Sequence, residues 1–171
     1  EDSLLLAQAL EACAKEGMRV LDMGCGTGLQ ALIAAGKGCI VTGVDVSPKA
    51  IETAKGNAAA NDLAVKFLVS DLFSRVKGRY DMIIFNFPYL PEKITPESRE
   101  WAAGERLELI ERFIRQARKY LKPHGFVLTI ISSLTGVERV TGMFEKQGMR
   151  TSIIAKKKIP WEELIALRAD L

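Results

Sequence analysis

Apolar segments alternate with helix-like patterns along this chain. Runs of β-branched and other apolar residues indicate strands, and apolar residues three and four positions apart indicate helices. This alternation predicts a parallel sheet covered by helices on both faces, an α/β fold. We expect strands at 19–23, 39–46, 65–69, 80–85, 126–132, 149–155 and 163–168, and helices at 4–15, 29–35, 48–60, 106–120 and 137–147.

Local signals predict where several of these elements begin or end. Ser47 followed by Pro48 is typical of a helix start, because Ser caps free N–H groups and Pro fits the first helical position. The Lys-Pro-His-Gly segment 122–125 is expected to end the long helix. We expect a turn containing Pro160 and the solvated lysines 156–158 to join the last two strands.

The composition favours one domain spanning residues 1–171, because 171 residues with 48% apolar content suffice for one core. No stretch approaches the roughly 20 apolar residues that cross a bilayer, and no signal peptide is visible, so we expect a cytoplasmic protein. The first residue is Glu1, and we expect a few residues to precede it. Scattered cysteines without a Cys-x-x-Cys pair argue against a disulfide framework and a metal site. The formal charge of +3 permits RNA or an acidic partner without requiring one.

A glycine-rich loop follows the first predicted strand and contains Gly24, Gly26 and Gly28. Glycine lacks Cβ, so the backbone can approach a ligand closely, and the next helix offers free N–H groups. From Gly26 onward the loop also satisfies a loose dinucleotide fingerprint, which leaves a nicotinamide cofactor as an alternative. No Lys follows at the position that a nucleoside-triphosphate P-loop requires, which excludes that class.

Polar residues stand at the carboxyl ends of four predicted strands, where ligands of such sheets bind. They are Asp22, Asp45, Asp71 with Leu72, and Asn86. Asp45 can accept two ribose hydroxyls, and Asp71 can accept an adenine amino proton. Each Asp alone is as easily a turn former or a helix cap, but four such positions in register favour a nucleoside-containing cofactor.

The Asn86-Phe87-Pro88-Tyr89 segment directly follows the apolar run 82–85. An amide or exocyclic amine is a weak nucleophile because its lone pair is delocalised, so a site that methylates it must hold its N–H groups with acceptors. The Asn86 oxygen and a carbonyl at Pro88 can supply these acceptors, and an aromatic ring such as that of Tyr89 can pack on the flat group. Together with the glycine loop, this segment predicts methyl transfer to a planar nitrogen.

These motifs resemble those of class I S-adenosylmethionine-dependent methyltransferases. Within that group the chain looks like the short archaeal and eukaryotic branch of the HemK-like release-factor glutamine N5-methyltransferases. The resemblance covers nearly the whole chain and rests on Glu1-Asp2-Ser3-x-Leu5-Leu6, Asp22-x-Gly24-x-Gly26-x-Gly28, the Asn86 segment, Trp101-Ala102-x-Gly104, Arg112-Phe113 and Trp161-Glu162-Glu163-Leu164. It implies a Rossmann-like, seven-stranded, mostly parallel sheet with an antiparallel C-terminal strand and helices on both faces.

The resemblance also implies a cofactor, S-adenosyl-L-methionine, and a role for individual residues. Its methyl group would pass to the acceptor by in-line displacement, without a metal. The implied cofactor-binding residues are Ser3, Asp22, Gly24, Cys25, Gly26, Gly28, Asp45, Val46, Asp71, Leu72 and Asn86. The implied catalytic residues are Asn86 and Pro88, which would bind the target amide, and Tyr89, which would pack on it.

The acceptor implied by the resemblance is the glutamine in the Gly-Gly-Gln loop of a translation release factor. The implied partner is a small zinc-ribbon activator protein, docked on an exposed sheet edge at 65–69. The alternative acceptor is an amino group of an RNA base, because the same Asn-x-Pro-Tyr chemistry serves adenine and guanine. A protein lysine is a further alternative, and a module that binds the cofactor without catalysis is a third.

The chain departs from the family pattern at two places. Phe87 stands where the family has Pro, which would stiffen the turn, so Phe87 can loosen Asn86 or widen the range of acceptors. Ala103 stands where glycine is usual, in a region expected to contact the protein substrate. Of the two tryptophans, Trp101 is the better functional candidate, and Trp161 is expected to pack.

Overall fold

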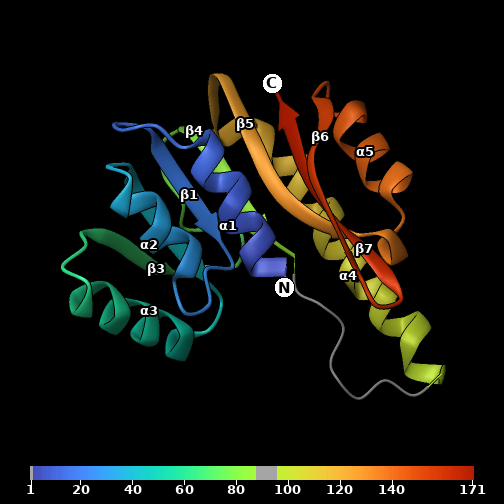
Figure 1. Ribbon diagram of the computed structural model, residues 1–171, viewed down its shortest axis with the longest axis horizontal. Helices are drawn as coiled ribbons and strands as arrows, with labels where there is room; N and C mark the ends of the chain where they lie inside the picture. The colour runs from blue at the N-terminus through green and yellow to red at the C-terminus, as the bar shows by residue number, and fades with distance from the viewer. Residues whose placement is uncertain (1, 88–95) are drawn as a thin grey trace.

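The computed structural model describes residues 2–87 and 96–171, with the side chains of 2–87 and 107–171. Its strands are β1 (Arg19–Met23), β2 (Ile40–Asp45), β3 (Val65–Val69), β4 (Tyr80–Asn86), β5 (Leu121–Ser132), β6 (Arg150–Ile159) and β7 (Glu162–Asp170). They form one sheet in the order β3-β2-β1-β4-β5-β7-β6 (Figure 1). The first five strands pair in parallel, and β7 runs antiparallel to both β5 and β6. The expected mostly parallel sheet with one antiparallel C-terminal strand is confirmed, and β3 lies at its edge as predicted.

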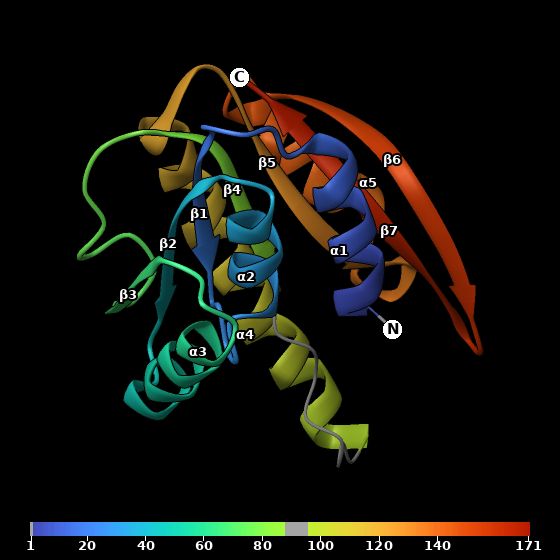
Figure 2. The ribbon, with the colours of Figure 1, turned by 60° about the vertical axis from the view of Figure 1, so that its left-hand side comes forward.

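Helices cover both faces of this sheet. They are α1 (Asp2–Cys13), α2 (Leu29–Gly36), α3 (Pro48–Ala60), α4 (Pro96–Ala117) and α5 (Val137–Lys146), with short 3-10 helices at Arg118–Tyr120 and Ser133–Thr135. Helices α1, α2 and α3 pack on one face, and α4 and α5 pack on the other (Figure 2). No helix among the described residues combines the length and the apolar character needed to span a membrane.

Two hydrophobic clusters hold the three layers together. In β4, Ile83 and Phe85 belong to the cluster under α4 and α5, whereas Met82 and Ile84 belong to the cluster under α1, α2 and α3. Successive strand side chains point to opposite faces, so a central strand must be apolar on both. This requirement is the physical reason for the continuous apolar run at 82–85.

The long helix and the strand after it differ from the sequence prediction. Helix α4 begins at Pro96 rather than at 106. Its first turns were not predicted because they are mostly polar and show no apolar periodicity. The segment 122–125, expected to end that helix, lies within β5. The strand pairing shifts between Tyr80 and Met82 of β4, and His124 adopts a φ of 64°. A local irregularity therefore lets a Pro-His-Gly sequence continue the strand.

The lysine run 156–158 was expected in a turn, and this prediction is wrong. All three residues belong to the edge strand β6, which pairs with β7 as far as Ile159. Lysines suit an edge strand because their charged ends reach water and hinder pairing with another chain. Trp161, at the turn between β6 and β7, is 95% exposed, so the expectation that it packs is also wrong.

Candidate functional site

A cavity of about 310 Å³ lies at the carboxyl ends of β1, β2 and β4 and beside the loop after β3. Its wall includes six residues predicted from the sequence: Gly24, Asp45, Val46, Asp71, Leu72 and Asn86. Four further residues of the wall were not predicted from the sequence: Met23, Ser70, Phe85 and Leu109. Leu109 comes from α4, and no local pattern could have shown that this distant helix reaches the cavity.

The glycine loop has a backbone shape that requires glycine. Gly24, Gly26 and Gly28 have φ values of 62°, 53° and 88°, in the left-handed region where other residues are strained. A Cβ on Gly24 would also come within 3.0 Å of the Phe85 ring. Helix α2 begins directly after Gly28, so its free N–H groups follow the loop.

Asp45 fastens this loop and still has acceptor capacity for a ligand. Its Oδ2 accepts the N–H of Gly26 at 2.9 Å, and its Oδ1 accepts the N–H of Ser47 at 2.9 Å. An ionised carboxylate offers about four lone-pair positions, so each oxygen can accept one further hydrogen bond. This geometry fits the two neighbouring hydroxyls of a ribose.

The side chains of Asp22 and Cys25 are buried at the glycine loop. Asp22 is buried, and its Oδ2 accepts the N–H of Ala31 in α2 at 3.0 Å. Burial raises the pKa of Asp22 to about 7; the Ala31 hydrogen bond opposes this rise, and the charge of Asp45 adds to it. Burial likewise raises the pKa of the Cys25 thiol, which stays protonated. Neither side chain is part of the cavity wall, so their predicted cofactor contacts are not seen in the side-chain geometry.

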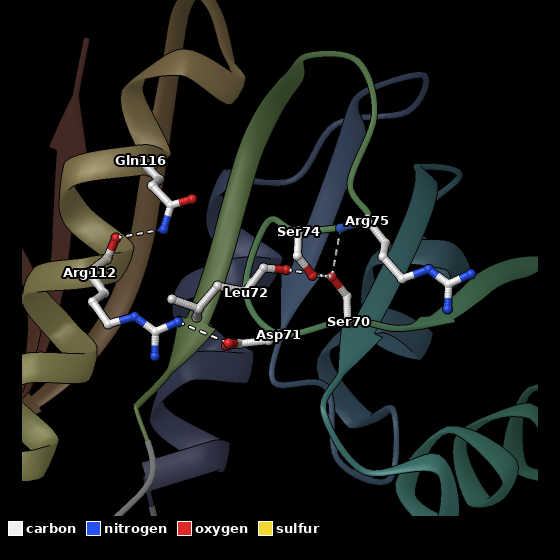
Figure 3. Close-up of polar contacts among 7 residues, drawn as sticks. All are labelled: Ser70, Asp71, Leu72, Ser74, Arg75, Arg112 and Gln116. Carbon is white, nitrogen blue, oxygen red and sulfur yellow. Dashed lines mark hydrogen bonds and ion pairs between the residues drawn. The ribbon is translucent and has the colours of Figure 1, made fainter.

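The loop after β3 is held in a strained shape by Ser70 (Figure 3). Leu72 has a φ of 45° and is buried, a conformation that costs a branched residue about 1–3 kcal/mol. Ser70 Oγ donates to the Leu72 carbonyl at 2.8 Å and accepts the N–H of Arg75 at 3.1 Å. These bonds hold Asp71 and Leu72 at the cavity wall. Ser70 therefore shapes the loop, although it belongs to no sequence motif.

Arg112 links α4 to this loop. Its Nη2 donates to Asp71 Oδ2 at 2.9 Å. Figure 3 draws this interaction as a dashed line. Both side chains are about half exposed, so the ion pair contributes at most about 1 kcal/mol to stability. The second oxygen of Asp71 remains able to accept an amino proton, the role predicted for this carboxylate from the sequence.

Asn86 ends β4 and meets the first turn of α1. Its Nδ2 donates to Asp2 Oδ2 at 2.9 Å and to Ser3 Oγ at 3.3 Å. Its Oδ1 is buried and has no hydrogen-bond partner among the described residues. A buried acceptor without a partner costs about 1–3 kcal/mol, and a hydrogen bond from an N–H group of a ligand would remove this cost.

Phe87 packs into an aromatic cluster behind Asn86. Its ring centroid lies 4.6 Å from that of Phe85 and 5.8 Å from that of Phe113 in α4. Phe87 is buried, so it anchors the chain directly after Asn86 and does not loosen it. Pro88 and Tyr89, the other predicted catalytic residues, lie outside the described residues, as does the side chain of Trp101.

Replacing Phe87 by Pro would restore the family pattern, yet we expect it to destabilise the protein by about 3 kcal/mol. The change removes a buried ring and leaves a cavity against Phe85 and Phe113. Denaturant unfolding would measure the loss of stability. Leu134→Ala is the control, because Leu134 is 75% exposed and its truncation leaves no buried cavity. A variant as stable as the parent protein would show that the aromatic cluster does not anchor this segment.

Residues 1–159 match the methyltransferase small domain family. The chain belongs to this family of methyltransferases. It is 39% identical over 176 residues to a protein from Methanocaldococcus jannaschii assigned as a protein N5-glutamine methyltransferase, covering 99% of this chain and 88% of that protein. This agreement confirms the predicted family, because the match extends over nearly the whole chain.

Two further comparisons place this methyltransferase among its relatives. It is 36% identical over 144 residues to a release factor glutamine methyltransferase from Koribacter versatilis, covering 75% of this chain and 51% of the relative. The chain therefore spans about half the length of that relative. One chain of a complex from E. cuniculi superposes on this chain with a TM-score of 0.76. That complex is described as responsible for methylation of the translation termination factor eRF1. That match has 22% identity and covers 99% of this chain and 94% of the other, so it supports the fold.

Proposed function

We propose that this methyltransferase binds S-adenosyl-L-methionine and methylates the glutamine side chain in the Gly-Gly-Gln loop of a translation release factor. The observation that carries the proposal is the buried Asn86 Oδ1, an acceptor without a partner among the described residues, on a residue that belongs to the cavity wall. The relatives assigned as glutamine methyltransferases support the same acceptor. The proposal treats residues 1–171 as one methyltransferase domain and places it in the cytoplasm, where release factors act.

The cavity fits the proposed cofactor. Its volume of about 310 Å³ is within the usual range for a small-molecule pocket. Gly24 would admit the methionine part, both Asp45 oxygens would accept the ribose hydroxyls, and Asp71 would accept the adenine amino proton. When bound, S-adenosyl-L-methionine supplies a methyl group activated by the positive sulfur.

Asn86 would position the acceptor nitrogen. Its Oδ1 would accept one N–H of the glutamine amide and hold the amide plane so that the nitrogen faces the methyl group. Such positioning matters because the amide lone pair is delocalised and attacks poorly without alignment. The new N–C bond would form as the C–S bond of the cofactor breaks and its electron pair stays on sulfur, and the nitrogen would release one proton to water. The carbonyl of Pro88 and the ring of Tyr89 are proposed to complete this site, from the resemblance alone.

A small zinc-ribbon activator is proposed as a partner at the β3 edge. Strand β3 pairs with β2 and ends the sheet, so its outer backbone groups can pair with a strand of another chain. Ile40, the first residue of β2, is 63% exposed and directly precedes Val41, which pairs with Val65 of β3. An apolar side chain next to an open strand edge suits an added strand better than it suits water.

The proposed function is tested by transfer of labelled methyl from S-adenosyl-L-methionine to a purified release factor, with and without the activator. A release factor whose loop Gln is replaced serves as the control. Labelling that requires the loop Gln supports the proposal. Salt-sensitive labelling of RNA, or labelling of a lysine, would instead assign the acceptor to one of the alternative classes. Tight cofactor binding with no labelled acceptor would favour a module without catalysis.

A further inference from the structure

The two ends of the Asn86 side-chain amide lie in different surroundings. The NH₂ end meets two acceptors, Asp2 Oδ2 at 2.9 Å and Ser3 Oγ at 3.3 Å. The oxygen end is buried and unpartnered among the described residues. Because NH₂ and O are similar in size, packing alone does not decide which end of an Asn amide points which way. The chemistry of the neighbours must decide it.

An ionised carboxylate makes this choice unambiguous, because it can accept hydrogen bonds and cannot donate them. If the Asn86 amide were reversed, its oxygen would face the Asp2 oxygen at about the same separation, and two acceptors would repel. Burial raises the pKa of Asp2, but the hydrogen bonds from Asn86 and from the Ser3 backbone lower it, and the net direction is downward. Asp2 therefore stays ionised near neutral pH and requires the NH₂ end to face it.

The Asp2 carboxylate belongs to helix α1, whose position is fixed by packing and by a hydrogen bond. Leu6 and Leu10 of α1 are fully buried against the sheet. Gln30 of α2 donates its Nε2 to the Ser3 carbonyl at 2.8 Å, which fastens the first turn of α1 as well. A carboxylate in the first helical turn is also favoured by the helix dipole.

We propose that Asp2 is a positioning residue, which, with Ser3 as a second acceptor, orients the Asn86 amide so that Oδ1 stays available to the N–H of a planar acceptor. The proposal rests on the proposed function, in which Asn86 receives the acceptor amide. It assigns Asp2 a task that no sequence motif predicted. It also gives a reason for helix α1 to lie across the end of β4, since it brings together Asp2 and Asn86, which are 84 residues apart in sequence.

The first test is Asp2→Asn, which keeps the shape but can present either an acceptor or a donor. The Asn86 amide can then reverse and offer NH₂ to the acceptor's N–H. We expect kcat for a release factor to fall at least about tenfold, with KM for S-adenosyl-L-methionine within about twofold. Glu11→Gln removes a charge from an exposed position of the same helix and should leave both constants unchanged.

An exchange of the two residues provides a rescue that a merely structural role would not predict. Asn86→Asp alone sets two carboxylates against each other and should be nearly inactive. Adding Asp2→Asn restores one N–H donor and one carboxylate, and leaves an acceptor oxygen facing the substrate. We expect the double variant to transfer methyl at least about tenfold faster than Asn86→Asp alone. A double variant no faster than Asn86→Asp would overturn the proposal.

A nuclear magnetic resonance measurement tests the orientation without any acceptor. The Asn86 side-chain NH₂ gives two ¹H–¹⁵N signals, identified by their absence in Asn86→Ala. We expect both protons to exchange slowly with water in the parent protein and much faster in Asp2→Asn. Unchanged exchange in Asp2→Asn would overturn the proposal, even if activity were lost. If the parent protein labels no acceptor, the proposed function fails, whereas the exchange result still decides whether Asp2 orients Asn86.

Discussion

Replacing Asn86 by Ala is expected to lower methyl transfer about 10²–10³-fold, the usual loss when one positioned polar group is removed from a reacting centre. The change removes the buried Oδ1 that is proposed to hold the target amide. It also removes the NH₂ group bound by Asp2 and Ser3. Initial rates with labelled cofactor measure the loss, and calorimetry measures cofactor binding, which we expect to weaken by about tenfold at most because Asp45 and Asp71 remain.

Asn61→Ala is a matched control for this prediction. Asn61 follows α3, is exposed, and donates its Nδ2 to the Asn57 carbonyl at 2.8 Å. Since it takes no part in the cavity wall, its loss should leave the transfer rate unchanged. If Asn86→Ala kept most of the parent rate, other groups would have to hold the acceptor. The unpartnered Asn86 Oδ1 would then no longer support the proposed function.

Raising the pH from about 4 to about 7 is expected to lower the free energy of unfolding through Asp22. Complete burial raises the pKa of this carboxyl to about 7, from 3.8 in the unfolded chain. The folded state therefore favours the protonated form, so its stabilising effect is complete below the unfolded pKa and is lost as pH rises through the folded one. A shift of this size corresponds to about 4 kcal/mol between the two limits.

Asp22→Asn should remove this dependence, because Asn has no proton to lose and its oxygen can still accept the Ala31 N–H. We expect the variant to be more stable than the parent protein at pH 8, and the difference to shrink toward pH 4. Denaturant unfolding at several pH values measures this, with the exposed Asp62→Asn as the control. A variant less stable than the parent at pH 8 would show that the N-terminus of α2 stabilises the carboxylate more than burial opposes it.

Much of the candidate site could be predicted because one rule converts order along the chain into position in space. In a parallel sheet, all strands end at the same edge, so residues that follow successive strands meet there. Asp45, Asp71 and Asn86 were found in this way, and all three are part of the cavity wall. The glycine loop was found from its spacing, and its positive φ values explain that spacing.

Contacts between distant elements could not be predicted in this way. Leu109 reaches the cavity from α4, and Asp2 meets Asn86 from α1. No periodicity marks either residue, because both contacts depend on how a helix crosses the sheet. The lysines of β6 were misplaced for a related reason: their place in a strand depends on pairing with β7 and not on their own preference.

The sequence by itself determined the layers of this protein, the edge of the sheet that carries the chemistry and the residues that stand at that edge. Periodicity and local capping are short-range properties, so they can be seen in the chain before it folds. Only the tertiary structure decided what each of those residues does. It buried Phe87 beside Asn86 and left the side-chain oxygen of Asn86 without a partner among the described residues. It also placed the Asp2 carboxylate against the NH₂ group of Asn86. Hydrogen bonds and burial join groups far apart in sequence, and these contacts exist only once the helices have packed on the sheet.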